Sequence, residues 1–282
     1  MGPRGFIVSY FGLDHKQSNL YSTDLSCIIF GVKKIFLSVV IPSYDEMANL
    51  QKGVLDKVKH FLEKKKYGYE VIVVDDGSKD GSIEFVEAFT KENPNFRIIK
   101  NEHLGKAGAV TAGVLAAEGE HILFTDMDQA TPIEEVEKLM PCFDKGFDIV
   151  IGSRSGTRKG APWTRMLMAK GMITLRTLLV GLPGISDTQC GFKCFKKDAA
   201  KKLFKKIYDF HHGFKRVSGS SVSAGFDVEL LYLAQKMKYK VKEVPVNWLY
   251  VETRRVSPLK DSIEGFLDLI RIKINDIRGQ YN

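Results

Sequence analysis

Ile122-Leu123-Phe124-Thr125-Asp126-Met127-Asp128 is an apolar run that ends in two carboxylates spaced two residues apart. Its first three residues predict a buried strand, and the glutamate-rich run from Glu134 onward predicts the beginning of a helix. Side chains two apart on an extended backbone point to the same side, so Asp126 and Asp128 should face together into the carboxyl end of the strand. Open α/β sheets bind their ligands at that end. Two carboxylates suit Mg²⁺ or Mn²⁺, with waters and a diphosphate as further ligands; solvated acidic residues at a strand end are the alternative.

Strand and helix patterns alternate on both sides of this stretch. Strands are predicted over residues 37–41, 70–74, 96–100, 147–152 and 187–195, and an extended segment over 241–248. Amphipathic or small-residue helices are predicted over residues 46–66, 82–92, 107–117, 197–207 and 226–236. Pro42 is expected to end the first strand. The alternation predicts an α/β fold with a mostly parallel, Rossmann-like sheet flanked by helices.

Composition and charge restrict the class of protein. The 282 residues are 44% hydrophobic and 27% charged, which is ordinary for a globular protein, and the net charge of +8 favours anionic partners. No basic run is interleaved with aromatic residues, so nucleic acid is disfavoured as a partner. Pro42-Ser43-Tyr44-Asp45-Glu46 stands where a dinucleotide site needs its glycines, which disfavours a dehydrogenase. The four cysteines lack zinc spacing, and Cys190 and Cys194 are expected to be packed, reduced thiols.

The chain contains no uncharged apolar stretch long enough to span a bilayer, but two segments suit a membrane surface. Residues 158–181 mix methionine and leucine with basic residues, which fits either an interfacial helix or a core helix. A C-terminal amphipathic helix should follow Ser257-Pro258, an N-cap with proline at the first helical position. We therefore expect a flexible extension over residues 1–34, the main domain over 35–250 and a membrane-docking helix within 251–282. The expected location is the cytoplasm, peripherally at the cytosolic face of a membrane.

Four motifs in order resemble the signature of family 2 glycosyltransferases. They are Val40 to Glu46 (VIPSYDE), Val73 to Ser78 (VVDDGS), Asp126-Met127-Asp128, and Gly152-Ser153-Arg154. The segments DTQCGFK from Asp187 and FDVELL from Phe226, with Val246-Asn247-Trp248, are similar to the dolichyl-phosphate β-glucosyltransferase branch of that family. The resemblance, which covers roughly residues 35–250, implies a GT-A fold and an inverting, metal-dependent enzyme.

The resemblance also implies roles in binding a nucleotide-sugar donor. Pro42, Tyr44 and Glu46 would line the nucleoside pocket, although Tyr44 could equally be a core aromatic. Asp76 could accept a hydrogen bond from uracil or ribose, whereas Asp75 could simply cap the turn. Lys106 could meet the diphosphate or lie solvated. Asp126 and Asp128 would hold the Mg²⁺ or Mn²⁺ that stabilises the departing UDP.

The acceptor determines which further groups the reaction needs. A polyprenyl phosphate is already an anionic nucleophile, so it needs cations that hold it in line and no general base. Arg154 and Arg165 are the preferred candidates by resemblance, with Lys193 as a third that could instead be a surface lysine. Asp187 and Gln189 would orient the sugar or the acceptor. With a hydroxyl acceptor, Asp187 or Asp227 would become the candidate base, although Asp227 could instead be a helix N-cap.

The function expected from these observations is transfer of a sugar, glucose by resemblance, from a UDP-sugar to a polyprenyl (dolichyl-type) phosphate with inversion. Two alternatives stay within the family: a soluble transferase acting on a glycan or protein hydroxyl, and a polyprenyl-phosphate mannosyltransferase using GDP-mannose. A third alternative is a nucleotide-sugar-binding protein without activity, which would not need a complete metal site.

Overall fold

The structure is a computed structural model that describes residues 34–154, 171, 174–217, 224–249 and 258–281. The chain divides into two compact units, Met1–Lys34 and Ile35–Asn282. The extension expected over residues 1–34 lies, apart from Lys34, outside the described residues, as does Arg165. The fold below is that of the second unit.

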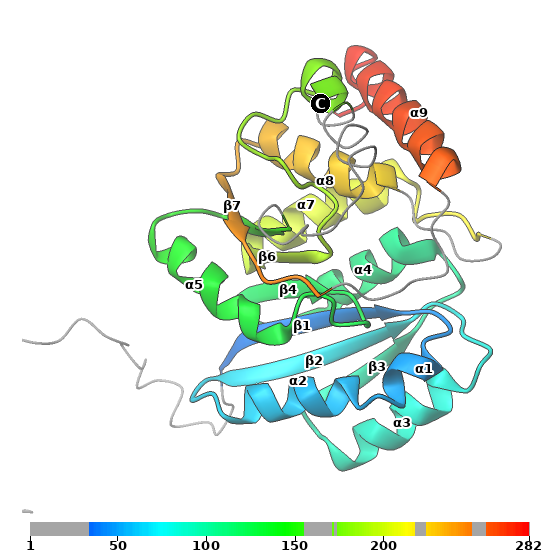
Figure 1. Ribbon diagram of the computed structural model, residues 1–282, viewed down its shortest axis with the longest axis vertical. Helices are drawn as coiled ribbons and strands as arrows, with labels where there is room; N and C mark the ends of the chain where they lie inside the picture. Colours follow the sequence, from blue (N-terminus) through cyan, green and yellow to red (C-terminus); the bar gives the residue numbers. More distant parts are fainter. Residues whose placement is uncertain (1–33, 155–170, 172–173, 218–223, 250–257, 282) are drawn as a thin grey trace, which may run out of the picture. The chain divides into compact units, whose positions relative to one another are not determined.

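A seven-stranded sheet forms the centre of this unit (Figure 1). In spatial order its strands are β3 (Phe96–Lys100), β2 (Gly68–Asp75), β1 (Ile35–Ser43), β4 (His121–Thr125), β6 (Phe192–Lys196), β5 (Ile149–Ser153) and β7 (Val241–Pro245). β6 runs antiparallel to both of its neighbours, β4 and β5, and the other described pairings are parallel. The predicted mostly parallel α/β sheet is therefore confirmed.

Helices cover both faces of the sheet. They are α1 (Met47–Leu50), α2 (Val54–Glu63), α3 (Ser82–Glu92), α4 (Gly105–Ala116), the 3₁₀ helix η2 (Ile133–Glu135), α5 (Val136–Asp144), α7 (Lys197–Phe210), α8 (Ala224–Lys236) and α9 (Pro258–Ile277). One hydrophobic core lies between the sheet and α4, α7, α8 and α9, and the other lies between the sheet and α1, α2, α3 and α5. Alternate residues of β1 serve the two cores, Val40 the first and Val39 the second, as the two-residue period of a strand requires.

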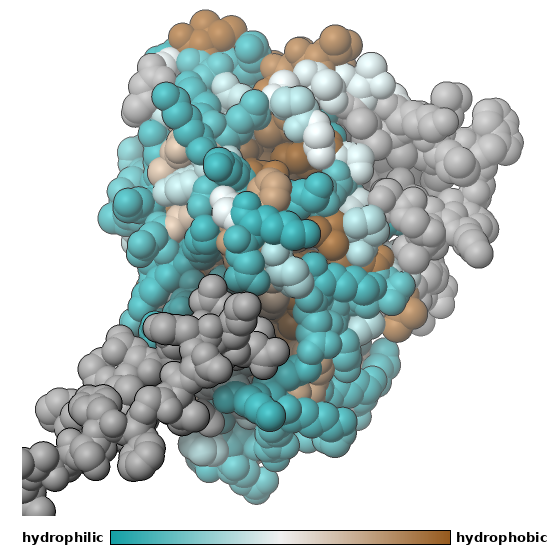
Figure 2. Space-filling view, turned by 90° about the vertical axis from the view of Figure 1, so that its left-hand side faces the viewer, coloured by the Kyte–Doolittle hydropathy of each residue, from teal (hydrophilic) through white to brown (hydrophobic). Residues whose placement is uncertain are grey.

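The direction of the strands fixes where a ligand site can lie. In Figure 1 β1 and β2 run from left to right, so their carboxyl ends are at the right of the view. Figure 2 shows the opposite side, at the amino ends of these strands. There hydrophilic side chains cover most of the described surface, and hydrophobic ones gather in the middle and at the upper edge. The loops that follow the carboxyl ends are therefore on the side turned away from Figure 2.

Three predictions about the elements need correction, apart from shifts of one to three residues at the ends of several others. Pro42 does not end the first strand, because β1 runs to Ser43 and Pro42 pairs with Val74 of β2. The single helix predicted over residues 46–66 is two helices, because Gly53 adopts a left-handed φ of 70° between α1 and α2. The strand predicted over 187–195 begins only at Phe192, and the residues before it form a turn.

The C-terminal helix α9 packs on α8 through one of its faces. Leu269 and Ile272 are buried against the core, while Phe266, Leu267, Ile274 and Ile277 are exposed. Most of the predicted segment 158–181 lies outside the described residues. Within its described part, residues 174–179 are helical. Within the described residues, no helix combines the length and the apolar character needed to cross a bilayer.

Candidate active site

Asp126 and Asp128 follow β4 at the carboxyl end of the sheet, as predicted. The Asp126 backbone N–H donates to the Gly191 carbonyl at 3.2 Å, and Oδ1 of Asp128 accepts from the Ala130 N–H at 2.9 Å. Both carboxylates line a cavity of about 150 Å³. Its other described lining residues are Thr125, Ala130, Thr131, Arg154, Gln189, Gly191 and Trp248. Four of the predicted site residues, Asp126, Asp128, Arg154 and Gln189, therefore meet at one cavity.

Gly191 gives the Asp126 carboxylate its room. A Cβ atom at position 191 would lie 1.9 Å from Oδ2 of Asp126, far inside van der Waals contact. Gly191 directly precedes the antiparallel strand β6, which runs beside β4. The close approach of these two chain segments therefore requires a residue without a side chain.

Lys106 contributes a cation to the same carboxylate. It lies at the beginning of α4, and its Nζ is 2.5 Å from Oδ1 of Asp126. Burial alone would lower the pKa of Lys106, but the charges of Asp126, Asp227 and Asp128 outweigh burial and raise it. Lys106 therefore stays protonated and holds a positive charge at the carboxylate pair.

The carboxylate pair fits a divalent cation that has other ligands besides the protein. Among the residues that the structure describes, no three His, Cys, Asp or Glu side chains form a group that could hold a metal ion. Mg²⁺ and Mn²⁺ do not need three such side chains, since they keep several waters and use substrate phosphates as ligands beside one or two carboxylates. The Lys106 ammonium on Asp126 shows that this position already favours positive charge.

Arg154 and Asp187 form a two-pronged ion pair beside the cavity. Nε and Nη2 of Arg154 each donate to one Asp187 oxygen at 2.7 Å, and the Arg154 backbone N–H donates to Oδ2 at 2.9 Å. Burial would raise the pKa of Asp187, but the bonds and charge of Arg154 outweigh it and hold the pKa below its usual value. A carboxylate that already accepts three hydrogen bonds and has a lowered pKa is a weak general base.

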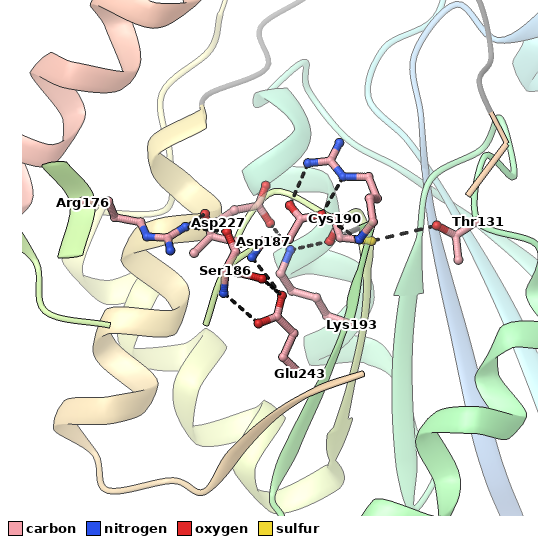
Figure 3. Close-up of polar contacts among 10 residues, drawn as sticks. Thr131, Arg176, Ser186, Asp187, Cys190, Lys193, Asp227 and Glu243 are labelled. Atoms are coloured by element: carbon pink, nitrogen blue, oxygen red, sulfur yellow. Dashed lines mark hydrogen bonds and ion pairs between the residues drawn. The ribbon is translucent and has the colours of Figure 1, made fainter. Parts of the chain in front are cut away.

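The segment from Ile185 to Gly191, which carries Asp187 and Gln189, is tied down from two sides (Figure 3). Glu243 of β7 accepts from the Ser186 N–H and hydroxyl at 2.7 Å each and from the Asp187 N–H at 2.9 Å. Arg176 donates to the Thr188 hydroxyl at 3.1 Å and to two carbonyls of the segment. Neither Glu243 nor Arg176 was expected at the site. Glu243 acts across 56 to 57 residues of sequence, and Arg176, although only 9 to 12 residues from its partners, lies in a segment whose packing the sequence left open.

Lys193 and Asp227 form a buried ion pair behind this segment. Nζ of Lys193 is 2.5 Å from Asp227 and donates to the Cys190 carbonyl at 2.7 Å, and the lysine side chain is fully buried (Figure 3). Lys193 is therefore neither a surface lysine nor exposed to an acceptor phosphate. The expected N-cap role of Asp227 is also wrong, because α8 begins at Ala224 and Asp227 lies in its first turn. Cys190 and Cys194 are buried free thiols, as predicted.

Asp76 positions the beginning of α4. Its Oδ1 accepts from the Leu104 N–H and its Oδ2 from the Gly105 N–H, both at 2.7 Å, and Nδ1 of His103 lies 3.0 Å from Oδ2. The side chain is buried, and burial raises its pKa despite these hydrogen bonds. Asp75 accepts from the Gly77 and Ser78 N–H groups, which confirms its role in the turn.

Tyr44 stands at the expected nucleoside position with a partner that the sequence did not reveal. Its ring stacks on the His103 imidazole, with centroids 4.2 Å apart. Tyr44 is half-buried and does not belong to either hydrophobic core of the described residues. Glu46 is the N-cap residue that precedes α1, where its carboxylate accepts from the Asn49 amide at 2.6 Å, and Pro42 lies within β1. The expected nucleoside contacts of Pro42, Tyr44, Glu46 and Asp76 stay predictions.

The mostly parallel sheet, with its carboxylate pair at the carboxyl edge, has the GT-A fold, and similar solved structures share this fold. Glucosyl-3-phosphoglycerate synthase from Mycobacterium tuberculosis, solved with Mn²⁺, UDP and glucosyl-3-phosphoglycerate, has a TM-score of 0.55 at 17% identity over 93% of this chain and 86% of that one. The mannosyltransferase PcManGT from Pyrobaculum calidifontis, solved with GDP-Man and Mn²⁺, has a TM-score of 0.54 at 19% identity over 84% of this chain and 65% of that one.

Sequence comparison identifies the family. The sequence model of Glycosyl transferase family 2 matches residues 38–204. A dolichyl-phosphate beta-glucosyltransferase of Dictyostelium discoideum is 35% identical over 265 residues, which are 88% of this chain and 77% of the relative. The enzyme of the same name from Homo sapiens is 33% identical, over 87% of this chain and 77% of the relative. The chain belongs to glycosyltransferase family 2 and is a glycosyltransferase, as its motifs predicted.

Proposed function

We propose that this enzyme transfers glucose from UDP-glucose, with inversion, to a dolichyl-type polyprenyl phosphate at the cytosolic face of a membrane. The names of its relatives support glucose as the sugar and dolichyl phosphate as the acceptor. The arrangement of the site supports a charged acceptor that carries its own nucleophilic oxygen.

The donor would lie along the carboxyl ends of β1, β2 and β4. The stacked rings of Tyr44 and His103 offer a face for the uracil base next to the Asp76 turn. Asp126 and Asp128 would hold Mg²⁺ or Mn²⁺, which when bound supplies Lewis-acid stabilisation of the departing diphosphate. Lys106 adds a second positive charge at the same carboxylates, where negative charge develops on the leaving group.

The observation that carries the acceptor assignment is the engagement of the two candidate bases. Asp187 accepts three hydrogen bonds from Arg154, and Asp227 is held in the buried pair with Lys193. Neither of these two lines the cavity; among the described residues, the carboxylates that line it are Asp126 and Asp128, the proposed metal ligands. An acceptor hydroxyl would lack a base here, whereas a phosphate needs none. Arg154, together with Arg165, would hold the acceptor phosphate in line.

A lipid-linked acceptor requires the site to lie at a membrane surface, and α9 supports such docking. Phe266, Leu267, Ile274 and Ile277 are exposed apolar side chains on this helix. Arg271 and Lys273 lie exposed among them. Each basic side chain near an anionic surface contributes about 1 kcal/mol, so several together support reversible attachment.

The test of the proposal compares acceptors that differ only in their head group. Wild type is incubated with labelled UDP-glucose, Mg²⁺ or Mn²⁺, and either farnesyl phosphate or farnesol. We expect metal-dependent label in farnesyl phosphate, none in farnesol, and loss of transfer with chelator or in Asp128→Ala. Transfer to farnesol or to an oligosaccharide would overturn the acceptor assignment, and transfer from GDP-mannose alone would overturn the donor assignment.

A further inference from the structure

A second and larger cavity, of about 470 Å³, lies beside the candidate active site. Its walls come from the beginning of α4, the segment after α7, and the helices α8 and α9. The lining residues that matter here are Leu104, Lys106, Phe214, Val217, Phe226 and Ile272. The volume is within the range of about 300–1,000 Å³ that is usual for sites that hold small organic ligands.

The wall of this cavity is mostly apolar, and its acidic groups already have partners. Glu229 contacts His211 and the Tyr281 hydroxyl, and Asp268 accepts from the Gly225 N–H and from Arg271. These carboxylates therefore do not direct unsatisfied negative charge at a ligand. The chemistry that fits is an apolar chain whose anionic end lies toward the lysine.

Lys106 joins the two cavities. Its side chain lines the larger cavity, while its ammonium contacts Asp126, which lines the smaller one. A molecule with its phosphate at the smaller cavity and its chain in the larger one would pass this lysine. An ammonium at that point is complementary to the phosphate end of such a molecule.

We propose that the larger cavity receives the isoprene units next to the phosphate of the acceptor. This proposal rests on the proposed function, because it takes a polyprenyl phosphate as the substrate. The chain must leave the active site beside its phosphate, and apolar surface that stays in water costs about 25 cal/mol per Å². The cavity removes this first part of the chain from water, and the remainder continues to the membrane.

Two variants test the proposal by changing the cavity in different ways. Val217 is half-buried, and its backbone N–H donates to the His103 carbonyl, a bond that substitution of the side chain leaves in place. Val217→Trp fills the cavity from its loop, whereas Phe214→Ser makes its wall polar without filling it. Leu178→Trp is the matched control, because Leu178 is 78% exposed and does not line the cavity.

The measured quantity is the ratio of kcat/KM for farnesyl phosphate to that for dimethylallyl phosphate, which has a single isoprene unit. We expect the longer chain to be preferred by wild type and by Leu178→Trp. The preference should fall about tenfold or more in Val217→Trp and Phe214→Ser, because fewer methylene groups are buried. An equal preference in all four proteins would overturn the cavity proposal and leave the proposed function intact.

A binding measurement separates this proposal from the proposed function. Farnesyl phosphate is titrated calorimetrically into the full chain with UDP and Mn²⁺ present, so that no turnover is needed. If no protein transfers glucose but Val217→Trp binds farnesyl phosphate about tenfold more weakly than Leu178→Trp, the cavity binds the prenyl chain although the proposed function fails. Equal affinity in the two variants would overturn the cavity proposal whatever the activity.

Discussion

At the scale of single residues, Gly191 decides whether the Asp126 carboxylate can take its present position. The Cβ of Gly191→Ala would lie 1.9 Å from Oδ2 of Asp126, so the carboxylate must move. A displacement of about 1 Å at a catalytic group can cost about 100-fold in rate, and we expect a loss of that size in kcat/KM for the nucleotide-sugar. Initial rates at saturating Mn²⁺ measure this loss, and circular dichroism verifies that the variant is folded.

Gly171→Ala is the control for this prediction. Position 171 is exposed, and a Cβ there meets no atom within 4 Å. The control should keep wild-type activity. Equal activity of Gly191→Ala and Gly171→Ala would show that the Asp126 carboxylate does not need its present position.

The Arg154–Asp187 pair predicts a pH-dependent contribution to stability. The pKa of Asp187 is lower in the folded protein than its ordinary value of 3.8. The pair therefore contributes its full stabilisation at pH values above 3.8 and loses it as the pH falls through the lower pKa of the folded state. Asp187→Asn should therefore cost about 2 kcal/mol of unfolding free energy near pH 7. Urea unfolding of wild type and Asp187→Asn should show that this difference in unfolding free energy becomes smaller as the pH falls below 3.8.

The same experiment can contradict the assignment. A difference between wild type and Asp187→Asn that grows on acidification would mean that the folded protein holds the protonated form of Asp187. The carboxyl group would then have a raised pKa and could serve as an acid or base, as a hydroxyl acceptor would require.

The sequence identified the residues whose chemistry is local. Asp126 and Asp128 could be placed together because their spacing and the strand before them fix their direction. Glu243 and His103 could not be found, since each meets its partner across a long sequence separation. Lys193 was misjudged for the same reason: its partner Asp227 is 34 residues away, so nothing near it in sequence indicates burial. Arg176 lies close in sequence to Thr188, but in a helical segment whose packing the sequence left open.

At the scale of elements, the break between α1 and α2 carries a separate prediction. Apolar periodicity continues through residues 46–66 and hides the break, which depends on the positive φ of Gly53. Gly53→Ala places a side chain in the left-handed region and should destabilise the fold by about 1 kcal/mol. The Gly171→Ala control should be as stable as wild type or more stable, because position 171 is helical and alanine is favoured over glycine in a helix. Urea midpoints of the three proteins measure this, and an unchanged or raised midpoint in Gly53→Ala would contradict the strained conformation.

The antiparallel strand β6 shows a second limit of sequence patterns. The apolar character of residues 187–195 predicts extended chain, but it does not tell which part pairs in the sheet. In the structure the first part is a turn held by Glu243 and Arg176, and pairing begins at Phe192. The turn is what places Gln189 at the cavity and Asp187 in its ion pair with Arg154.

At the scale of the whole molecule, the proposed membrane docking predicts a measurable affinity for vesicles. Wild type should co-sediment with vesicles containing anionic phospholipid, and Leu267→Asp with Ile277→Asp should weaken binding at least tenfold, because both side chains are exposed on α9. Tyr208→Asp, at an exposed position on α7, is the control. Equal binding of all three proteins would exclude α9 as the docking element.

The proposed inverting transfer of glucose to a polyprenyl phosphate fixes the anomeric configuration of the product, which can be measured. Wild type is incubated with UDP-glucose, farnesyl phosphate and Mn²⁺, and the purified lipid product is examined by proton and phosphorus NMR. We expect a β-glucosyl phosphate, formed only with metal and not by Asp128→Ala. An α-linked product, or glucose attached to a hydroxyl, would contradict it.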